Sequence, residues 1–186
     1  MMLKFYTILI FAAALISNLH GQDTITPINY AAVIQVDSIP KEVLFSTARK
    51  WFNEEFADYK SIVQFEDKEE GVITVKAIIY TKHYNEEYLY GQFACNVRCQ
   101  ISIYVKDGKY RYEFSNFIHD CIDNGQYKDL VKENSLGILT NEKSYTKNSR
   151  NAYQKLWNET ILSVDANVQD LINSLKKAMS SPIKNW

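Results

Sequence analysis

FACNVRCQISIYV (residues 93–105) decides the fold of this 186-residue chain, together with the dipeptide Asp107-Gly108 and the run KYRYEF (109–114) that follow it. The odd-numbered residues of the first run are apolar or cysteine, and mostly polar residues alternate with them. This period of two predicts a strand with one buried face. Asp-Gly favours a two-residue type I′ hairpin, in which both central residues need positive φ. Such a turn sets three apolar pairs opposite each other: Val105–Tyr110, Ile103–Tyr112 and Ile101–Phe114. The turn and the hydrophobic pattern therefore predict the same register.

Composition and net charge indicate the size of the domain and the kinds of molecule that the protein can attract. Hydrophobic residues make up 46% of the chain, and the formal net charge is −1. A chain of this length and apolar content can bury the core of one globular domain. Because the near-neutral charge provides no long-range attraction to polyanions, we expect no nucleic-acid partner.

The first 21 residues have the pattern of a secretory signal peptide. Lys4 gives a positive start, residues 5–16 are almost all apolar, and residues 17–21 are mostly small or polar. The apolar run is shorter than the ~20 residues that a transmembrane helix needs. Leu19 is larger than the usual residue three positions before a cut, but we expect cleavage near Gly21, and no neighbouring cysteine offers a lipid attachment site. The sequence thus predicts a secreted or periplasmic protein without a stable membrane anchor.

The segment after the leader predicts a strand followed by a helix. Residues 30–36 alternate in polarity and predict a strand. Ser38 is the predicted N-cap of the helix, with Pro40 in its first turn. Apolar residues then recur every three or four positions and predict the buried stripe of that helix: Leu44, Ala48, Trp51, Phe52 and Phe56.

A second hairpin is predicted over residues 62–80. Strands 62–65 and 72–80 are joined by a charged turn, 67–71. The acidic residues around this turn lack the spacing of a calcium-binding loop, so we interpret it as a solvated turn.

The last part of the chain predicts a connection and a long helix. Residues 119–150 form a connecting region, in which 123–149 is interpreted as an extended connection. A helix over 151–179 would be ~40 Å long. We expect its apolar stripe to lie on the central strand, with Trp157, Ile161, Val164, Val168 and Leu171 against Val97, Cys99, Ile101 and Ile103.

The order of elements predicts the fold class. A strand, a helix, four strands and a helix (β-α-β-β-β-β-α) indicate one α+β domain over residues 22–186, with both helices on one face of a five-stranded antiparallel sheet. Four motifs then carry a resemblance: the strand ending in Val36-Asp37, the helix with Trp51, the 67–71 turn before Val72-Ile73, and VKDGKYRY (105–112). On these motifs the segment from residue 30 to about 118 resembles an uncharacterised family of secreted bacterial domains with a TATA-binding-protein-like (TBP-like) fold. The resemblance implies a fold and an exported location, and it implies no catalytic residues.

Candidate catalytic and metal-binding groups are few. Beyond the predicted leader the histidines are His83 and His119, and the cysteines are Cys95, Cys99 and Cys121. The chain contains no nucleophile elbow, zinc-protease motif, phosphate-binding loop or Cys-x-x-Cys pair. On a strand, His119 and Cys121 share a face while the residue between them, an aspartate, points away. We therefore predict no catalytic residue, no cofactor and no metal site.

The three thiols are expected to be reduced. Cys95 and Cys99 lie on the predicted buried face, ~13 Å apart, and cannot bond to each other. In the hairpin register Cys121 lies opposite Ala94 and faces the other way. A bend after Phe117 that brings Cys121 round would instead favour a disulfide.

The sheet face opposite the helices is the candidate binding surface. On it Tyr104 is expected opposite Arg111, as a cation–aromatic pair. The candidate partner-binding residues are Tyr80, Arg98, Tyr104, Arg111 and Phe117. The hypothesis is an exported, non-enzymatic binding domain for a protein or small ligand of unknown identity. The alternatives are an exported enzyme with an unrecognised active site and a merely solvated sheet face.

Overall fold

A computed structural model of the chain describes residues 26–79, 94–122, 135–141 and 151–180. The strands are β1 (Tyr30–Gln35), β2 (Val63–Asp67), β3 (Val72–Ile79), β4 (Ala94–Lys106), β5 (Lys109–Ile122) and β6 (Gly137–Ile138). The helices are α2 (Lys41–Glu55), α3 (Tyr59–Ile62) and α5 (Asn151–Ser180). The sheet is antiparallel in the order β1-β5-β4-β3-β2, and β6 also pairs with β5. The predicted α+β class is confirmed, and β6 and α3 are additions to the predicted element order.

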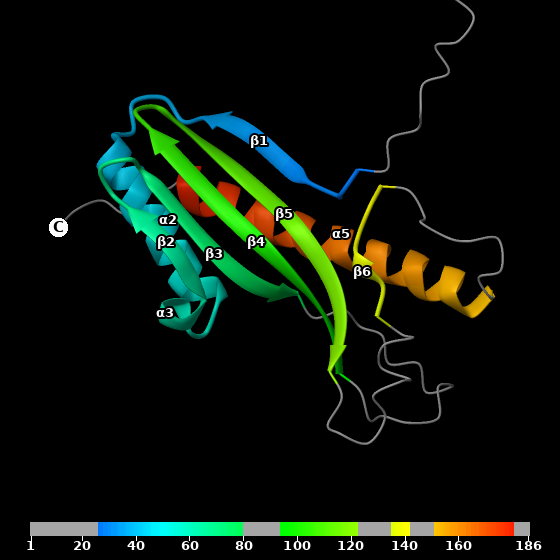
Figure 1. Cartoon of the computed structure of the whole chain (residues 1–186). Helices are drawn as coiled ribbons and strands as arrows, with labels where there is room; N and C mark the ends of the chain where they lie inside the picture. Colours follow the sequence, from blue (N-terminus) through cyan, green and yellow to red (C-terminus); the bar gives the residue numbers. More distant parts are fainter. Residues whose placement is uncertain (1–25, 80–93, 123–134, 142–150, 181–186) are drawn as a thin grey trace, which may run out of the picture.

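The core lies between one face of the sheet and the two long helices. Figure 1 shows α2 and α5 on the same side of the sheet, with α5 running across it. The buried stripe of α5 consists of Val164, Val168, Ile172, Leu175 and Met179. Ile161 and Leu171, predicted in this stripe, are partly buried against the core, and Trp157 is also partly buried. No helix among the described residues is both long and apolar enough to span a membrane.

The central hairpin has the predicted register but not the predicted turn. Val105 pairs with Tyr110, and the other two apolar pairs follow as expected. Gly108 has a φ of 71°, whereas Asp107 is absent from the residues with positive φ, so the turn is not type I′. The Asp107 side chain instead accepts a hydrogen bond of 2.8 Å from the backbone N–H of Lys41.

The predicted N-cap of α2 was wrong. Ser38 has a φ of 68°, and the helix begins at Lys41 after Pro40, which forms no side-chain cap. Because the hairpin turn lies beside the start of α2, Asp107 satisfies one of the free N–H groups there. The cap of α2 thus comes from a residue distant in sequence.

A β-bulge changes the face of every residue in the second half of β5. Gln100 pairs with Ser115 and Arg98 with Ile118, so β5 holds one residue more than β4 in this interval. Asn116, with a φ of 55°, lies in the bulge. Beyond it the side chains exchange faces, because successive residues of a strand point to opposite sides.

The bulge overturns two predictions. Phe117 was expected on the uncovered face, but it is fully buried in the core. Cys121 lies opposite Cys95 rather than Ala94, and the two form a disulfide. Cys99 is free and buried, as expected. The predicted reduced state of Cys95 and Cys121 is therefore wrong, while the exclusion of a Cys95–Cys99 bond is confirmed.

The predicted bounds of other elements agree only approximately with the structure. The predicted strand 62–65 is observed as Val63–Asp67, preceded by the single turn of α3. Within the predicted connecting region, β5 continues to Ile122, and Leu139 beyond β6 is buried. The predicted leader and most of 119–150 lie outside the described residues.

Candidate functional site

The outer face of the sheet, defined as the side opposite α2 and α5, is the candidate site. By register it carries alternate residues of each strand, which include Val33 on β1, Phe65 on β2, Val72, Thr74, Lys76 and Ile78 on β3, Arg98, Gln100, Ser102 and Tyr104 on β4, Arg111, Glu113, Ser115, Ile118 and Asp120 on β5, and Ile138 on β6. No described helix covers this face in Figure 1.

Tyr104 and Arg111 lie together as predicted. They are directly paired across β4 and β5, and the Arg111 guanidinium carbon lies 5.5 Å from the centre of the Tyr104 ring. The same guanidinium forms an ion pair with Glu113, two residues along β5. Because Glu113 neutralises the arginine, the pair presents an aromatic ring and a compensated charge rather than a free cation.

Arg98 belongs to the other end of the outer face. It lies six residues from Tyr104 along β4, a separation of ~20 Å. Its guanidinium is 2.8 Å from the carboxylate of Asp120. The structure therefore separates Arg98 from the Tyr104–Arg111 pair, removes Phe117 from the face, and leaves Tyr80 outside the described residues.

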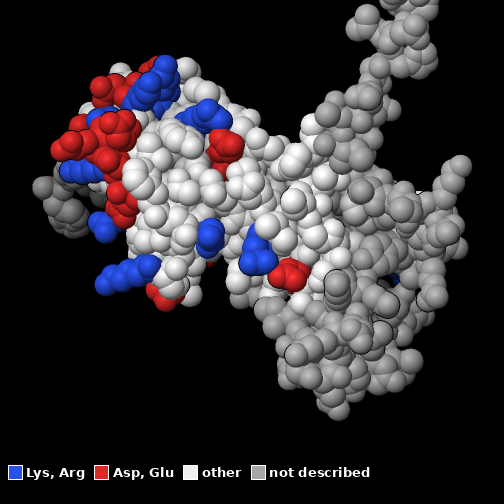
Figure 2. Space-filling model, in the orientation of Figure 1, with Lys and Arg blue, Asp and Glu red and all other residues white. Residues whose placement is uncertain are grey.

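The centre of the outer face is polar, and Lys76 and Glu113 lie there beside hydroxyl and amide groups. Thr74 and Ser102 share a hydroxyl hydrogen bond of 3.0 Å across β3 and β4. Ser102 is 2% exposed, so neighbouring side chains cover it although it lies on the outer face. In Figure 2, which views this face, charged side chains gather at the end of the sheet near the β2–β3 turn, and the centre shows few.

Apart from Tyr104, the exposed apolar side chains on this face were not predicted from the sequence. Among the described residues, large hydrophobic side chains with substantial exposure are Val33 (57%), Phe65 (53%), Ile78 (46%), Tyr104 (37%), Ile138 (62%) and Leu162 (70%). All except Leu162 lie on the outer face. Ile78 and Val33 carried a usable signal, because each occupies the outward position of an alternating strand where a polar residue is expected.

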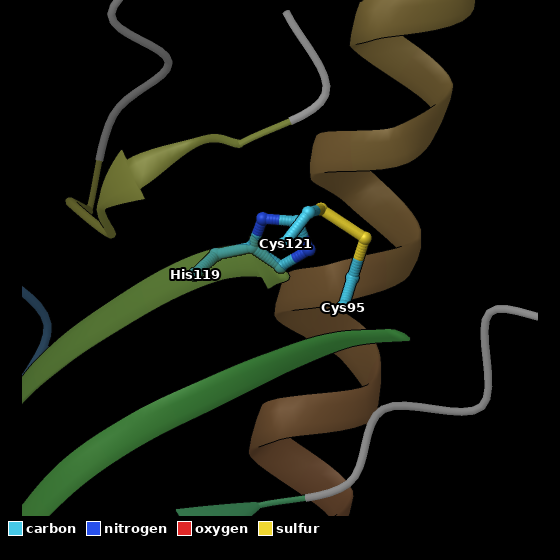
Figure 3. A group of neighbouring side chains, drawn as sticks. All are labelled: Cys95, His119 and Cys121. Carbon is cyan, nitrogen blue, oxygen red and sulfur yellow. A yellow bond between two sulfur atoms is a disulfide. The ribbon is translucent and has the colours of Figure 1, made fainter. Parts of the chain in front are cut away.

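A second group of side chains gathers on the inner face, at the end of the β4–β5 pair. The possible ligand atoms of Cys95, His119 and Cys121 all lie within 4.8 Å of one another. Figure 3 shows the imidazole ring of His119 beside the disulfide. As predicted, Asp120 points away, since it pairs with Arg98 on the outer face. The cluster itself was not predicted, although the apolar positions of β5 change from even (110, 112, 114) to odd (117, 121) at the bulge.

The groups with raised pKa values lie on the inner side of the sheet. Burial raises the pKa of the Cys99 thiol to about 12. Burial also raises the pKa of Tyr59 to about 12, and its hydrogen bond to Glu66 contributes. Burial, with the neighbouring carboxylate of Asp165 on α5, raises the pKa of Tyr30 to about 12. These raised pKa values keep the buried hydroxyl and thiol groups protonated, so none of these groups is activated as a nucleophile.

A shallow, open depression of about 410 Å³ lies at the start of β1. Its lining residues are Thr26, Pro27, Ile28, Asn29, Tyr30 and Asn141. Tyr30 is the only ionisable side chain among them, and burial holds it protonated, so this depression offers no acid–base pair.

Comparison with known proteins supports the fold and no activity. A crystal structure of a DUF4468 family protein from Bacteroides ovatus is 16% identical, with a TM-score of 0.51 over 86% of this chain and 90% of that chain. A TBP-like protein from Parabacteroides distasonis is 15% identical, with a TM-score of 0.51 over 81% of this chain and 93% of that chain. At these identities the likeness shows the fold alone. Curated protein sequences give no significant match.

Residues 30–120 match the family described as a domain of unknown function (DUF4468) with TBP-like fold. The match spans α2, α3 and the strands β1 to β5, up to Asp120. Residues 30–120 of this chain therefore form a DUF4468 domain with a TBP-like fold.

Proposed function

We propose that this protein is an exported, non-enzymatic binding domain whose outer face docks against another protein. One observation carries the proposal: the exposed large apolar side chains of the described strands all project from that face. Exposing large apolar side chains to water is unfavourable, so a sheet face that carries several of them is a candidate surface for contact with another protein.

The chemistry of the outer face favours a protein over a polyanion. Arg98 is paired with Asp120, and Arg111 with Glu113, so the arginines are already compensated. A nucleic acid would have to compete with both carboxylates for them. A partner surface of apolar and uncharged polar groups would bury Ile78 and Val33 without breaking either ion pair.

The outer face also resembles a protein interface in composition. Tyrosine and arginine are enriched at such interfaces, and Tyr104 and Arg111 lie in contact. Neighbouring hydroxyl and amide groups, on Thr74, Ser102 and Gln100, can exchange hydrogen bonds with a partner. Export, predicted from the first 21 residues, would bring this face to partners outside the cytoplasm.

Site-specific photo-crosslinking tests the proposal. A photoreactive phenylalanine analogue would replace Ile78 in one variant and Leu162 in the other, and each would be expressed in cells that export the protein. Both positions are exposed, but Leu162 lies on α5, away from the outer face. We expect a discrete adduct from position 78 and none from position 162.

Competition identifies a specific adduct. Excess parent protein should remove it, whereas a protein with Arg98, Tyr104 and Arg111 all replaced by alanine should not. Adducts of equal intensity from positions 78 and 162, or none from position 78, would reject the proposal. An adduct of twice the chain mass would show self-association instead of a different protein partner.

A further inference from the structure

The β-bulge in β5 places three reactive side chains in one cluster. Without the additional residue at Asn116, Cys121 would face away from Cys95, as the uninterrupted hairpin register predicts. With it, Cys95, Cys121 and His119 all face the inner side, and His119 is fully buried. We propose that the Cys95–Cys121 disulfide is a reversible thiol–disulfide couple, in which His119 stabilises the thiolate of Cys121 when an external dithiol attacks Cys95.

The hydrogen bond to His119 determines which ring nitrogen carries the proton. The backbone N–H of Leu136, just before β6, donates to Nδ1 at 3.1 Å. A nitrogen that accepts a hydrogen bond carries no proton, so the neutral ring is protonated on Nε2. Nε2 is buried, and in Figure 3 one ring nitrogen lies toward β6 and the other toward the sulfur atoms. His119 therefore directs an N–H donor to the disulfide side.

Burial determines which sulfur an external thiolate attacks. Cys95 is partly exposed at the second position of β4, whereas Cys121 is 4% exposed. The attacking thiolate forms a bond to Sγ of Cys95, the Sγ–Sγ bond breaks, and its electron pair leaves on Cys121. Exchange is faster when the leaving thiolate is stabilised, and an N–H donor supplies that stabilisation at the buried sulfur.

A second thiol of the reductant completes the reaction. This second thiolate attacks the reductant sulfur that is bonded to Cys95 and forms an internal disulfide in the reductant. The bond to Cys95 breaks, and Cys95 leaves as a thiolate that takes a proton. The dithiol is oxidised by two electrons and the protein disulfide is reduced by two. Cys99 takes no part, because it is buried and its pKa of about 12 keeps it protonated.

The same geometry disfavours a metal site in the reduced protein. Two thiolates and an imidazole are a common ligand set for Zn²⁺. An Nε2 ligand needs a lone pair on that nitrogen, which would move the proton to Nδ1 and break the hydrogen bond from Leu136. Thiol exchange keeps that bond.

A matched pair of substitutions tests the role of His119. His119→Gln places an amide N–H near the former Nε2, and His119→Asn keeps a polar group near the former Nδ1 without a donor at the sulfur. Reduction of the folded protein by dithiothreitol would be followed by alkylation and mass spectrometry. We expect a rate proportional to dithiothreitol concentration, a decrease of about tenfold in His119→Asn, and a decrease of less than about threefold in His119→Gln.

Several results would overturn the proposal. A rate that does not depend on dithiothreitol concentration would mean that reduction waits for unfolding, and equal rates in the parent and His119→Asn would exclude the N–H donor. If Co²⁺ added to the reduced protein gave a thiolate charge-transfer band that required His119, the cluster would be a metal site. If both variants fail to fold, the pKa of Cys121 can be measured from thiolate absorbance in a folded Cys95→Ser, Cys99→Ala protein. A Cys121 pKa at or above the ordinary value of a cysteine thiol would refute the proposal.

Discussion

Replacing Asp107 by alanine tests whether the hairpin turn caps α2. The carboxylate of Asp107 accepts from the backbone N–H of Lys41 at 2.8 Å, and Lys41 is the first residue of the helix. Losing an N-cap side chain costs about 1 kcal/mol, and losing a negative charge at a helix N-terminus costs about 0.3–1 kcal/mol more. We expect Asp107→Ala to lower the free energy of unfolding by about 1.5 kcal/mol.

Two control variants isolate the cap. Asp107→Asn keeps a side-chain oxygen acceptor and loses only the charge, so it should cost about 0.3–1 kcal/mol, less than Asp107→Ala. Ser38→Ala should cost less than about 0.5 kcal/mol, because Ser38 does not cap the helix.

Urea unfolding followed by circular dichroism gives the free energy of each variant. The reasoning would be refuted if Asp107→Ala lowered the free energy of unfolding by less than about 0.3 kcal/mol, or if Ser38→Ala lowered it more than Asp107→Ala does.

Three further predictions concern Gly71, Cys99 and helix α5. Gly71→Ala should cost about 3 kcal/mol in urea unfolding, because its Cβ would lie 2.6 Å from the carbonyl oxygen of Val105, whereas Gly108→Ala, with open space around it, should cost about 1 kcal/mol. In the folded protein the pKa of Cys99 is raised from 9.0 to about 12, so its contribution of up to about 4 kcal/mol is complete below pH 9 and is lost as the pH rises to 12. Cys99→Ala should flatten the decrease in stability measured over that interval; an unchanged slope would contradict this. Truncation after Ser149 removes α5 and should give aggregates in size-exclusion chromatography with light scattering, whereas a folded monomer would show that the helix is dispensable.

The outer face was predictable in part. Tyr104 and Arg111 lie within a few residues of the turn, where the register has little room to shift, and their contact was expected correctly. Phe117 lies on the far side of the bulge, where one additional residue reverses every side chain. The sequence contained a sign of this reversal at Asn116, since asparagine tolerates positive φ and the apolar positions change parity there.

Local patterns determined the elements of this protein. Alternation of polarity specified β3, β4 and the first part of β5, and a period of three to four residues specified α2 and α5, because burial of one face acts over a few neighbouring residues. These elements, in their order along the chain, were sufficient to predict an α+β fold with helices on one face.

Only the tertiary structure decided how distant residues meet. The cap of α2 by Asp107, the disulfide between Cys95 and Cys121, and the hydrogen bond from Leu136 to His119 all join residues far apart in sequence. The disulfide and the direction of the His119 side chain depend on the bulge, which shifts the second half of β5 by one residue, and the cap depends on the hairpin turn lying beside the start of α2. A shift of one residue leaves the hydrophobic pattern almost unchanged but moves a side chain to the opposite face, so contacts across the sheet follow from the folded backbone rather than from local sequence.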